Sequence, residues 1–233
     1  MKHRHVAGVV ALFLCLGAAV VQAQYYYYTL PEGAGPIFRL GLGPSFFQDG
    51  RLTQFATPGL APTGPVPSTV SYDTGLAAEA AIGWAFNQYA ALDFETGYIG
   101  AEINNVPGYI SDNSRLYNVP FLVNFTLSCP IPHTILVPYI GVGAGGADVV
   151  FDTDNFQDNA GLNGVVGSEN DVVFAGQAFA GLRFQLTHHV SFDLGYKFFA
   201  TSNPTFSYPP DDFKVGFRGV RTHSILFAFK FDF

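Results

Sequence analysis

Hydrophobic and polar residues alternate along the end of the chain, from Thr222 to Phe233. One face carries Ile225, Phe227, Phe229, Phe231 and Phe233, and the other carries Ser224, Leu226, Ala228, Lys230 and Asp232. A period of two is typical of a β-strand with two different faces. A row of alternating phenylalanines at the end of the chain favours contact with lipid over the edge of a soluble sheet. Because a strand in lipid cannot leave backbone groups unpaired, the pattern predicts a closed barrel.

Seven earlier segments alternate in the same way. They span about 36–47, 72–86, 90–102, 115–127, 135–149, 172–186 and 190–199. Short connections between them alternate with long ones at 48–72, 103–113, 150–171 and 200–215, as an up-and-down barrel requires. We therefore expect an all-β, transmembrane, antiparallel barrel of eight strands with long extracellular loops and both termini in the periplasm. Prolines 58, 62, 65 and 67 argue against a ladder strand in 48–72.

The first residues resemble a secretory signal. Lys2 and Arg4 precede an apolar run of 16 residues, Val6 to Val21, and Ala23 offers a small residue before a cleavage site. The run is shorter than the ~20 residues that a spanning helix needs. The predicted organisation is a signal peptide at 1–23, a periplasmic lead-in at 24–35 and an outer-membrane barrel at 36–233.

Composition agrees with an exported barrel. The net charge moves from −7 to −9 when cleavage removes Lys2 and Arg4, so a nucleic-acid partner is not expected. Charged residues make up only 12% of the chain, against about 25% in typical soluble domains. After cleavage Cys129 is the one remaining cysteine, which excludes an internal disulfide.

The alternation places charged side chains inside the barrel. The inward set is Arg39, Glu79, Asp93, Glu95, Arg183, Asp193, Lys197, Lys230 and Asp232. A three-residue turn at 187–189 would set Arg183 directly opposite Asp193, within ion-pair reach. We expect such pairs to close the lumen, because an unpaired buried charge costs several kcal/mol. The glycines at 141, 143 and 145 leave a second outcome open, a narrow wet path along one wall.

Several segments resemble one known family. Asn118-Val119-Pro120, Pro138 to Gly145, Ala180 to Phe184, Leu194 to Phe198 and Ser224 to Phe233 are similar to strands four to eight of the small outer-membrane β-barrel family, which includes opacity-type surface proteins and barrels similar to the OmpA membrane domain. The resemblance implies eight strands, an outer-membrane location and contact with outer-membrane lipid. It also implies that the barrel-assembly machinery reads the terminal aromatic strand at Phe229, Phe231 and above all Phe233. The family shares no catalytic residues, so none are carried over.

Enzymatic and metal-dependent chemistry finds little support. His223 and Ser224 point to opposite faces of one strand and cannot act together. Cys129, His133, His188 and His189 lack the spacing of a structural zinc site, and the run Asp152, Asp154 and Asp158 departs from a calcium loop. We therefore expect no enzyme, cofactor or metal. The two functions left open are a structural or surface-interaction role through extracellular loops that meet a ligand, and a small porin-like channel for small solutes.

Overall fold

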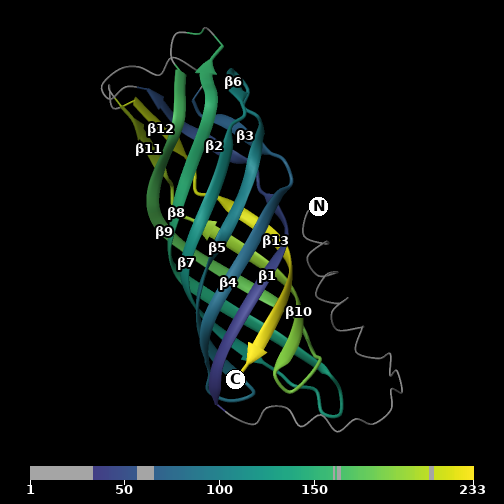
Figure 1. Ribbon diagram of the computed structural model, residues 1–233. Helices are drawn as coiled ribbons and strands as arrows, with labels where there is room; N and C mark the ends of the chain where they lie inside the picture. Colours follow the sequence, from purple (N-terminus) through teal and green to yellow (C-terminus); the bar gives the residue numbers. More distant parts are fainter. Residues whose placement is uncertain (1–33, 57–65, 160, 162–163, 210–212) are drawn as a thin grey trace, which may run out of the picture.

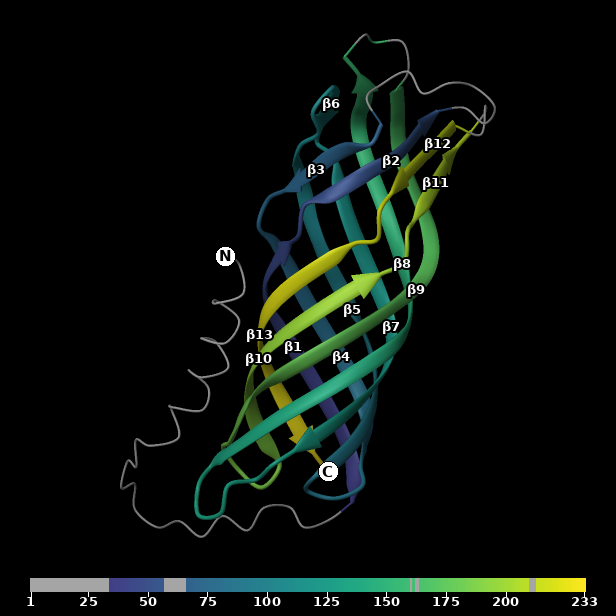
Figure 2. The same cartoon turned by 180° about the vertical axis from the view of Figure 1, so that it is seen from behind.

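Eight long antiparallel strands form a closed ring (Figures 1 and 2). The computed structural model describes residues 34–56, 66–159, 161, 164–209 and 213–233. The expected signal peptide and all but the last two residues of the lead-in lie outside these ranges. The ring strands are β1 (Gly35–Phe47), β4 (Gly75–Ala85), β5 (Ala90–Asn105), β7 (Arg115–Ser128), β8 (Leu136–Asp158), β9 (Gly164–Gln185), β10 (Val190–Thr201) and β13 (Arg221–Asp232).

The first and last strands close the ring. On one side β1 pairs with β13, with Leu40 opposite Phe229 and Ser45 opposite Ser224. On its other side β1 pairs with β4, with Leu40 opposite Ala80. Each ring strand therefore has two partners, which confirms the predicted eight-stranded barrel. Among the described residues, no helix is long and apolar enough to cross a membrane.

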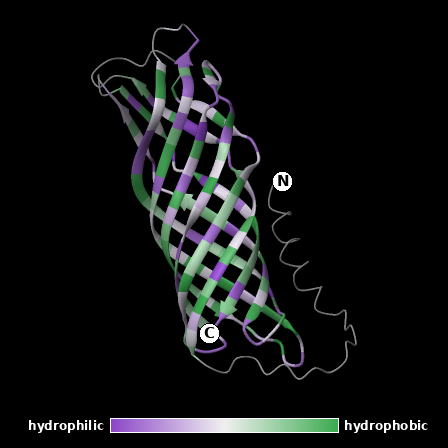
Figure 3. Ribbon diagram, viewed as in Figure 1, coloured by the Kyte–Doolittle hydropathy of each residue, from purple (hydrophilic) through white to green (hydrophobic). Residues whose placement is uncertain are grey.

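The predicted faces are correct along the ring strands. On β13, Ile225, Phe227 and Phe229 are exposed, whereas Leu226 and Ala228 are buried inside. Figure 3 shows the resulting alternation of hydrophobic and hydrophilic positions along the strands. The outward row forms an apolar belt around the barrel, as a lipid-facing wall requires.

The predicted loops at 48–72 and 200–215 are wrong in part, because each contains two strands. These are β2 (Gly50–Ala56), β3 (Ser68–Tyr72), β11 (Thr205–Tyr208) and β12 (Phe213–Phe217). They pair in the order β11, β12, β2, β3, and β3 continues onto β5. Pro67 did not exclude a strand here, because it lies just outside β3 rather than within it. Pro58, Pro62 and Pro65 lie outside the described residues.

The predicted loops at 103–113 and 150–171 also contain ladder strands. β5 runs on to Asn105, and a short strand, β6 (Tyr109–Asp112), pairs with the end of β8. β8 extends to Asp158 and β9 begins at Gly164, well beyond the predicted bounds of 149 and 172. The acidic residues Asp152, Asp154 and Asp158 fall in the predicted loop at 150–171. They instead belong to long strands, since Phe151 and Thr153 between them are buried.

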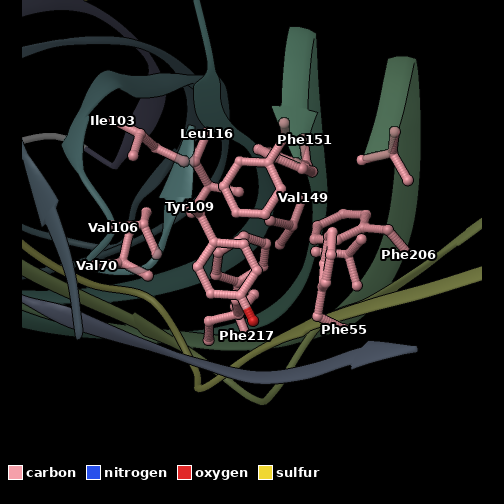
Figure 4. Close-up of a cluster of buried hydrophobic side chains, with 14 of the residues drawn as sticks. Phe55, Val70, Ile103, Val106, Tyr109, Leu116, Val149, Phe151, Phe206 and Phe217 are labelled. Atoms are coloured by element: carbon pink, nitrogen blue, oxygen red, sulfur yellow. The ribbon is translucent and has the colours of Figure 1, made fainter. Parts of the chain in front are cut away.

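These additional strands and strand ends lengthen the barrel at one end. We call this part, formed by β2, β3, β6, β11, β12 and the adjoining ends of β5, β7, β8 and β9, the extension. The four-stranded sheet lies across from the upper parts of β5, β7, β8 and β9 at the end opposite the short turns (Figures 1 and 2). Apolar side chains from both sides point toward one another inside it, among them Phe55, Phe151, Phe206 and Phe217 (Figure 4). The extension is thus a packed apolar core rather than a set of separate loops.

Candidate functional site

The predicted inward charges meet in the lower barrel around Arg39 on β1. Its Nε lies 3.1 Å from Glu79 Oε1 on β4, and its Nη2 donates to Glu95 Oε2 on β5 at 3.0 Å. Asp93 Oδ1 lies 3.7 Å from the same Nη2. All four side chains are buried. One guanidinium therefore serves three carboxylates, which limits the cost of burying each of them.

Lys197 on β10 completes this cluster from the opposite wall. Its ammonium group is paired with both Glu79 and Glu95. In the ring, β10 and β5 are separated by β13, β1 and β4 on one side and by β7, β8 and β9 on the other. The pair formed by Lys197 and Glu95 therefore crosses the full width of the lumen.

Two amide side chains that the sequence reasoning did not single out as site residues hold the carboxylates in place. Asn124 on β7 donates to Asp93 Oδ1 and Glu95 Oε2, both at 2.8 Å. Gln177 on β9 donates to Glu95 Oε2 at 3.1 Å and to Asn124 Oδ1 at 2.7 Å. Their inward parity on strands was visible in the sequence. Which carboxylate Asn124 and Gln177 reach depends on the register between strands that are far apart in the sequence.

A second set of charges lies nearer the short-turn end. Arg183 and Asp193 are directly opposed on β9 and β10, as the turn length predicted, and form two hydrogen bonds of 2.8 and 2.9 Å. Lys230 pairs with Asp232 on β13 itself. A cavity of about 150 Å³ opens here, and Arg39, Arg183 and Lys230 contribute to its wall.

Neighbouring side chains occupy the space above the inward glycines of β8. A Cβ atom on Gly141 would lie 2.3 Å from the Phe179 ring, and one on Gly143 would lie 1.9 Å from Asn124 Oδ1. The Arg39 guanidinium lies 5.7 Å from the centre of the same Phe179 ring. Phe179 and Asn124 therefore approach Gly141 and Gly143 closely and occupy the space that a narrow wet path along this wall would need.

Tyr139 fills the adjoining part of the lumen. Its hydroxyl lies 2.6 Å from the places where Cβ atoms on Gly181 and Gly195 would be. Its ring centre is 5.1 Å from the Arg183 guanidinium. A cavity of about 10 Å³ remains beside Arg39, Tyr139 and Lys197. This is about the space of a single water.

Above the charged cluster the lumen becomes apolar. A layer of buried side chains follows, formed by Ala77, Ile99, Leu122, Ala147, Ala175, Phe199 and Leu226. The aromatic core of the extension comes next. Sequence reasoning missed this core because it assigned most of these residues to loops. The alternation of Val149, Phe151 and Thr153 with acidic residues was the signal that could have revealed it.

The residues considered for catalysis or metal binding do not assemble into such a site. His223 lies on the outer wall, hydrogen-bonded to Tyr196 and Gln48, while Ser224 points inward to Ser45. Within the described ranges no group of three or more His, Cys, Asp or Glu side chains is arranged to hold a metal ion. The distinctive feature of the interior is therefore that charged, apolar and aromatic side chains fill it.

Comparison with known proteins agrees with the geometry. Residues 11–233 match the family described as outer membrane protein beta-barrel domain. Neisserial surface protein A is similar in structure, with 15% identity, a TM-score of 0.51, and coverage of 87% of this chain and 100% of that chain. OprG from Pseudomonas aeruginosa is 14% identical, with a TM-score of 0.55 and coverage of 87% of this chain and 98% of that chain. AlkL in lipid bilayers is 16% identical, with a TM-score of 0.50 and coverage of 91% of this chain and 97% of that chain. Because the identities are this low, the structural similarity shows a shared fold alone. No curated protein matches the chain by sequence.

Proposed function

Because the chain belongs to the outer membrane protein β-barrel family, we propose that it is a closed, non-enzymatic barrel of the outer membrane that presents its extension for surface interactions. In this proposal the chain reaches the membrane through a cleaved signal peptide and the barrel-assembly machinery. The extension faces the cell exterior, because short turns are periplasmic in such barrels. The filled lumen is the observation that carries the proposal.

Three features of the interior favour closure over conduction. The ion pairs of Lys197 with Glu79 and Glu95 cross the lumen. An apolar layer that includes Leu122 and Phe199 follows, and the aromatic core of the extension lies beyond it. An eight-stranded interior is just wide enough for side chains to fill. A solute would have to displace the ion pairs, the apolar layer and the aromatic core.

The exterior of the extension favours a role in surface contact. Its strands are paired rather than free, so little ordering entropy is lost when a partner binds. One side of it carries a set of acidic residues on β6, β8 and β9, namely Asp112, Asp148, Asp152, Asp154, Glu169 and Asp171. A rigid acidic surface of this kind suits a basic partner on a host, a phage or a neighbouring cell.

Planar-bilayer recording of the refolded mature protein tests closure. We expect no stable large conductance steps under conditions in which an open porin gives them. The unboiled protein must migrate differently from the boiled protein on a gel, which shows that the recorded sample is folded. Steady open-channel steps from such a sample would favour the alternative, a small porin-like channel.

The surface role is tested on whole cells. Cells that display the protein should bind a basic surface or host-cell layer more strongly than cells without it. Changing Asp152, Asp154 and Glu169 to Asn, Asn and Gln should reduce this binding, whereas Asp49→Asn, a change outside the acidic set, should not. Equal binding by both variants would contradict a role for the acidic side.

A further inference from the structure

Positive charges outside the lumen gather on one side of the barrel. After residue 23 the chain has nine Lys and Arg residues, and four of them, Arg39, Arg183, Lys197 and Lys230, point into the lumen. Arg115 on β7 is paired with Glu102. The other four are Arg51, Lys214, Arg218 and Arg221, and all lie on or beside β2, β12 and β13. The acidic set described above lies on other strands, β6, β8 and β9, and Asp49 is the described acidic residue that lies beside these arginines in the sequence.

The backbone brings three of these arginines together. The Arg218 amide donates to the Arg51 carbonyl at 2.8 Å, and the Gln48 amide donates to the Arg221 carbonyl at 2.9 Å. All three arginine side chains are exposed. Across the described ranges, none of them forms an ion pair with a carboxylate, including that of the nearby Asp49. We call Arg51, Arg218 and Arg221 the arginine cluster.

The cluster lies at the upper edge of the apolar belt. On β13 the outward row runs from Phe229 through Phe227 and Ile225 to His223 and then Arg221. From Phe233 to Arg221 the strand is about 40 Å long, which at the usual strand tilt is about 30 Å along the membrane normal, slightly more than the ~25 Å apolar band of such barrels. Arg221 is thus the first charged residue above the lipid tails on this strand.

Polar and aromatic side chains mark the same boundary. Tyr196 on β10 hydrogen-bonds His223, and His223 hydrogen-bonds Gln48, the residue next to Arg221 across the β1 edge. Phe46 on β1 lies directly opposite His223 and is exposed on the outer wall. Amphipathic rings are typical of the level of lipid headgroups. The arginine cluster is therefore positioned where a headgroup, rather than a solute, is the adjacent molecule.

We propose that the arginine cluster binds the phosphate groups of a phosphorylated glycolipid in the outer leaflet. A guanidinium is planar and always charged, and its N–H groups match phosphate oxygens in pairs. The long arginine stems lie along apolar surface while their heads reach the polar layer. The acyl chains of the same lipid pack on Phe46, Ile225 and Phe227 below. Three exposed arginines that have no carboxylate partner among the described residues, above an exposed apolar surface, suit a ligand with an anionic head and an apolar tail.

The experiment uses the mature protein refolded in vesicles that contain either lipid A with its phosphates or dephosphorylated lipid A. The protein is then extracted in mild detergent, and retained lipid is measured by native mass spectrometry. We expect at least tenfold more retained lipid A than dephosphorylated lipid. The triple variant R51Q/R218Q/R221Q should lose this preference. R115Q, on the other side of the barrel, is the matched control and should keep it.

Two further measurements test whether charge alone, or charge together with the apolar surface, accounts for the binding. The variant R51K/R218K/R221K retains the charges and should retain much of the binding, and each variant is checked for folding by the shift in gel mobility on boiling. Full retention of lipid A by the folded triple glutamine variant would overturn the proposal, as would equal retention of the dephosphorylated lipid. Binding of inorganic phosphate or a soluble heparin oligosaccharide with the same affinity as lipid A would also overturn it, because the apolar surface would then contribute nothing.

Discussion

The Lys197 ammonium forms a buried ion pair with the Glu95 carboxylate on the opposite wall of the barrel. The two residues are separated by 102 positions in the sequence. Glu95 is almost fully enclosed, and it also accepts hydrogen bonds from Arg39, Asn124 and Gln177. A contact across the whole lumen ties together strands that share no backbone hydrogen bond.

Removing the lysine charge should weaken the barrel. Lys197→Met keeps the length of the side chain but leaves Glu79 and Glu95 with Arg39 as their one cation within the described cluster. Breaking a buried ion pair by losing one partner costs about 3–5 kcal/mol. The folded gel band of the variant should therefore disappear at a lower temperature. Adding Glu79→Gln should restore part of the loss, and an unchanged melting temperature in the single variant would refute this role.

The pair formed by Arg183 and Asp193 allows a cleaner measurement. Asp193→Asn leaves the buried Arg183 guanidinium without its carboxylate, so thermal stability should fall. In a double-mutant cycle with Arg183→Met, the coupling energy between the two side chains should reach about 0.5–3 kcal/mol. Additive effects of the two changes would mean that the observed hydrogen bonds contribute no net stability.

Phe151 supports the extension rather than the membrane-spanning ring. Its ring lies 5.2 Å from that of Phe217, 5.4 Å from Phe156 and 5.8 Å from Phe206. Phe151→Ala should cost about 3–5 kcal/mol, the usual range for a buried phenylalanine. Limited proteolysis should then cleave β2, β3, β11 or β12 while the ring stays resistant. Val166→Ala, at a position that is 70% exposed, is the control and should change little.

The extension should also open at high pH. Burial raises the pKa of Tyr208 above its ordinary value of about 10, and nearby Glu169 and Asp152 raise it further. The folded state therefore prefers the neutral phenol, so its stability is complete below pH ~10 and falls as the pH rises from there toward the raised pKa. Proteolysis of the extension should increase in that range. Tyr208→Phe should reduce the increase, and an identical pH profile in the variant would exclude Tyr208 as a contributor.

Phe233 is the predicted key residue of the assembly signal. Its side chain is 75% exposed at the end of the lipid-facing row. Deleting Phe233, or changing it to Asp, should leave a periplasmic chain that proteases degrade, and Phe233→Tyr should assemble normally. Fractionation of cell envelopes gives the amount of each variant in the outer membrane. Normal levels of the deletion variant would show that assembly does not depend on this residue.

The sequence by itself determined the features that depend on neighbouring positions. Strand parity alone separates Phe227 and Phe229 on the lipid side from Ala228 and Lys230 inside. The short turn at 187–189 likewise sets Arg183 opposite Asp193, because a tight hairpin leaves one register available. Local geometry was sufficient in both cases.

Tertiary structure decided which distant residues meet. The partners of Glu95 depend on how all eight strands are shifted when the ring closes, and no local pattern specifies that shift. The extension was missed for the same reason, since β2 and β12 are short strands that gain their partners only after the chain has gone around the barrel. Leu52 and Val215 are buried only because that pairing brings them into the same apolar cluster as Phe151 and Phe156. Burial between segments so far apart in the chain is a property of the closed fold, so it becomes visible only in three dimensions.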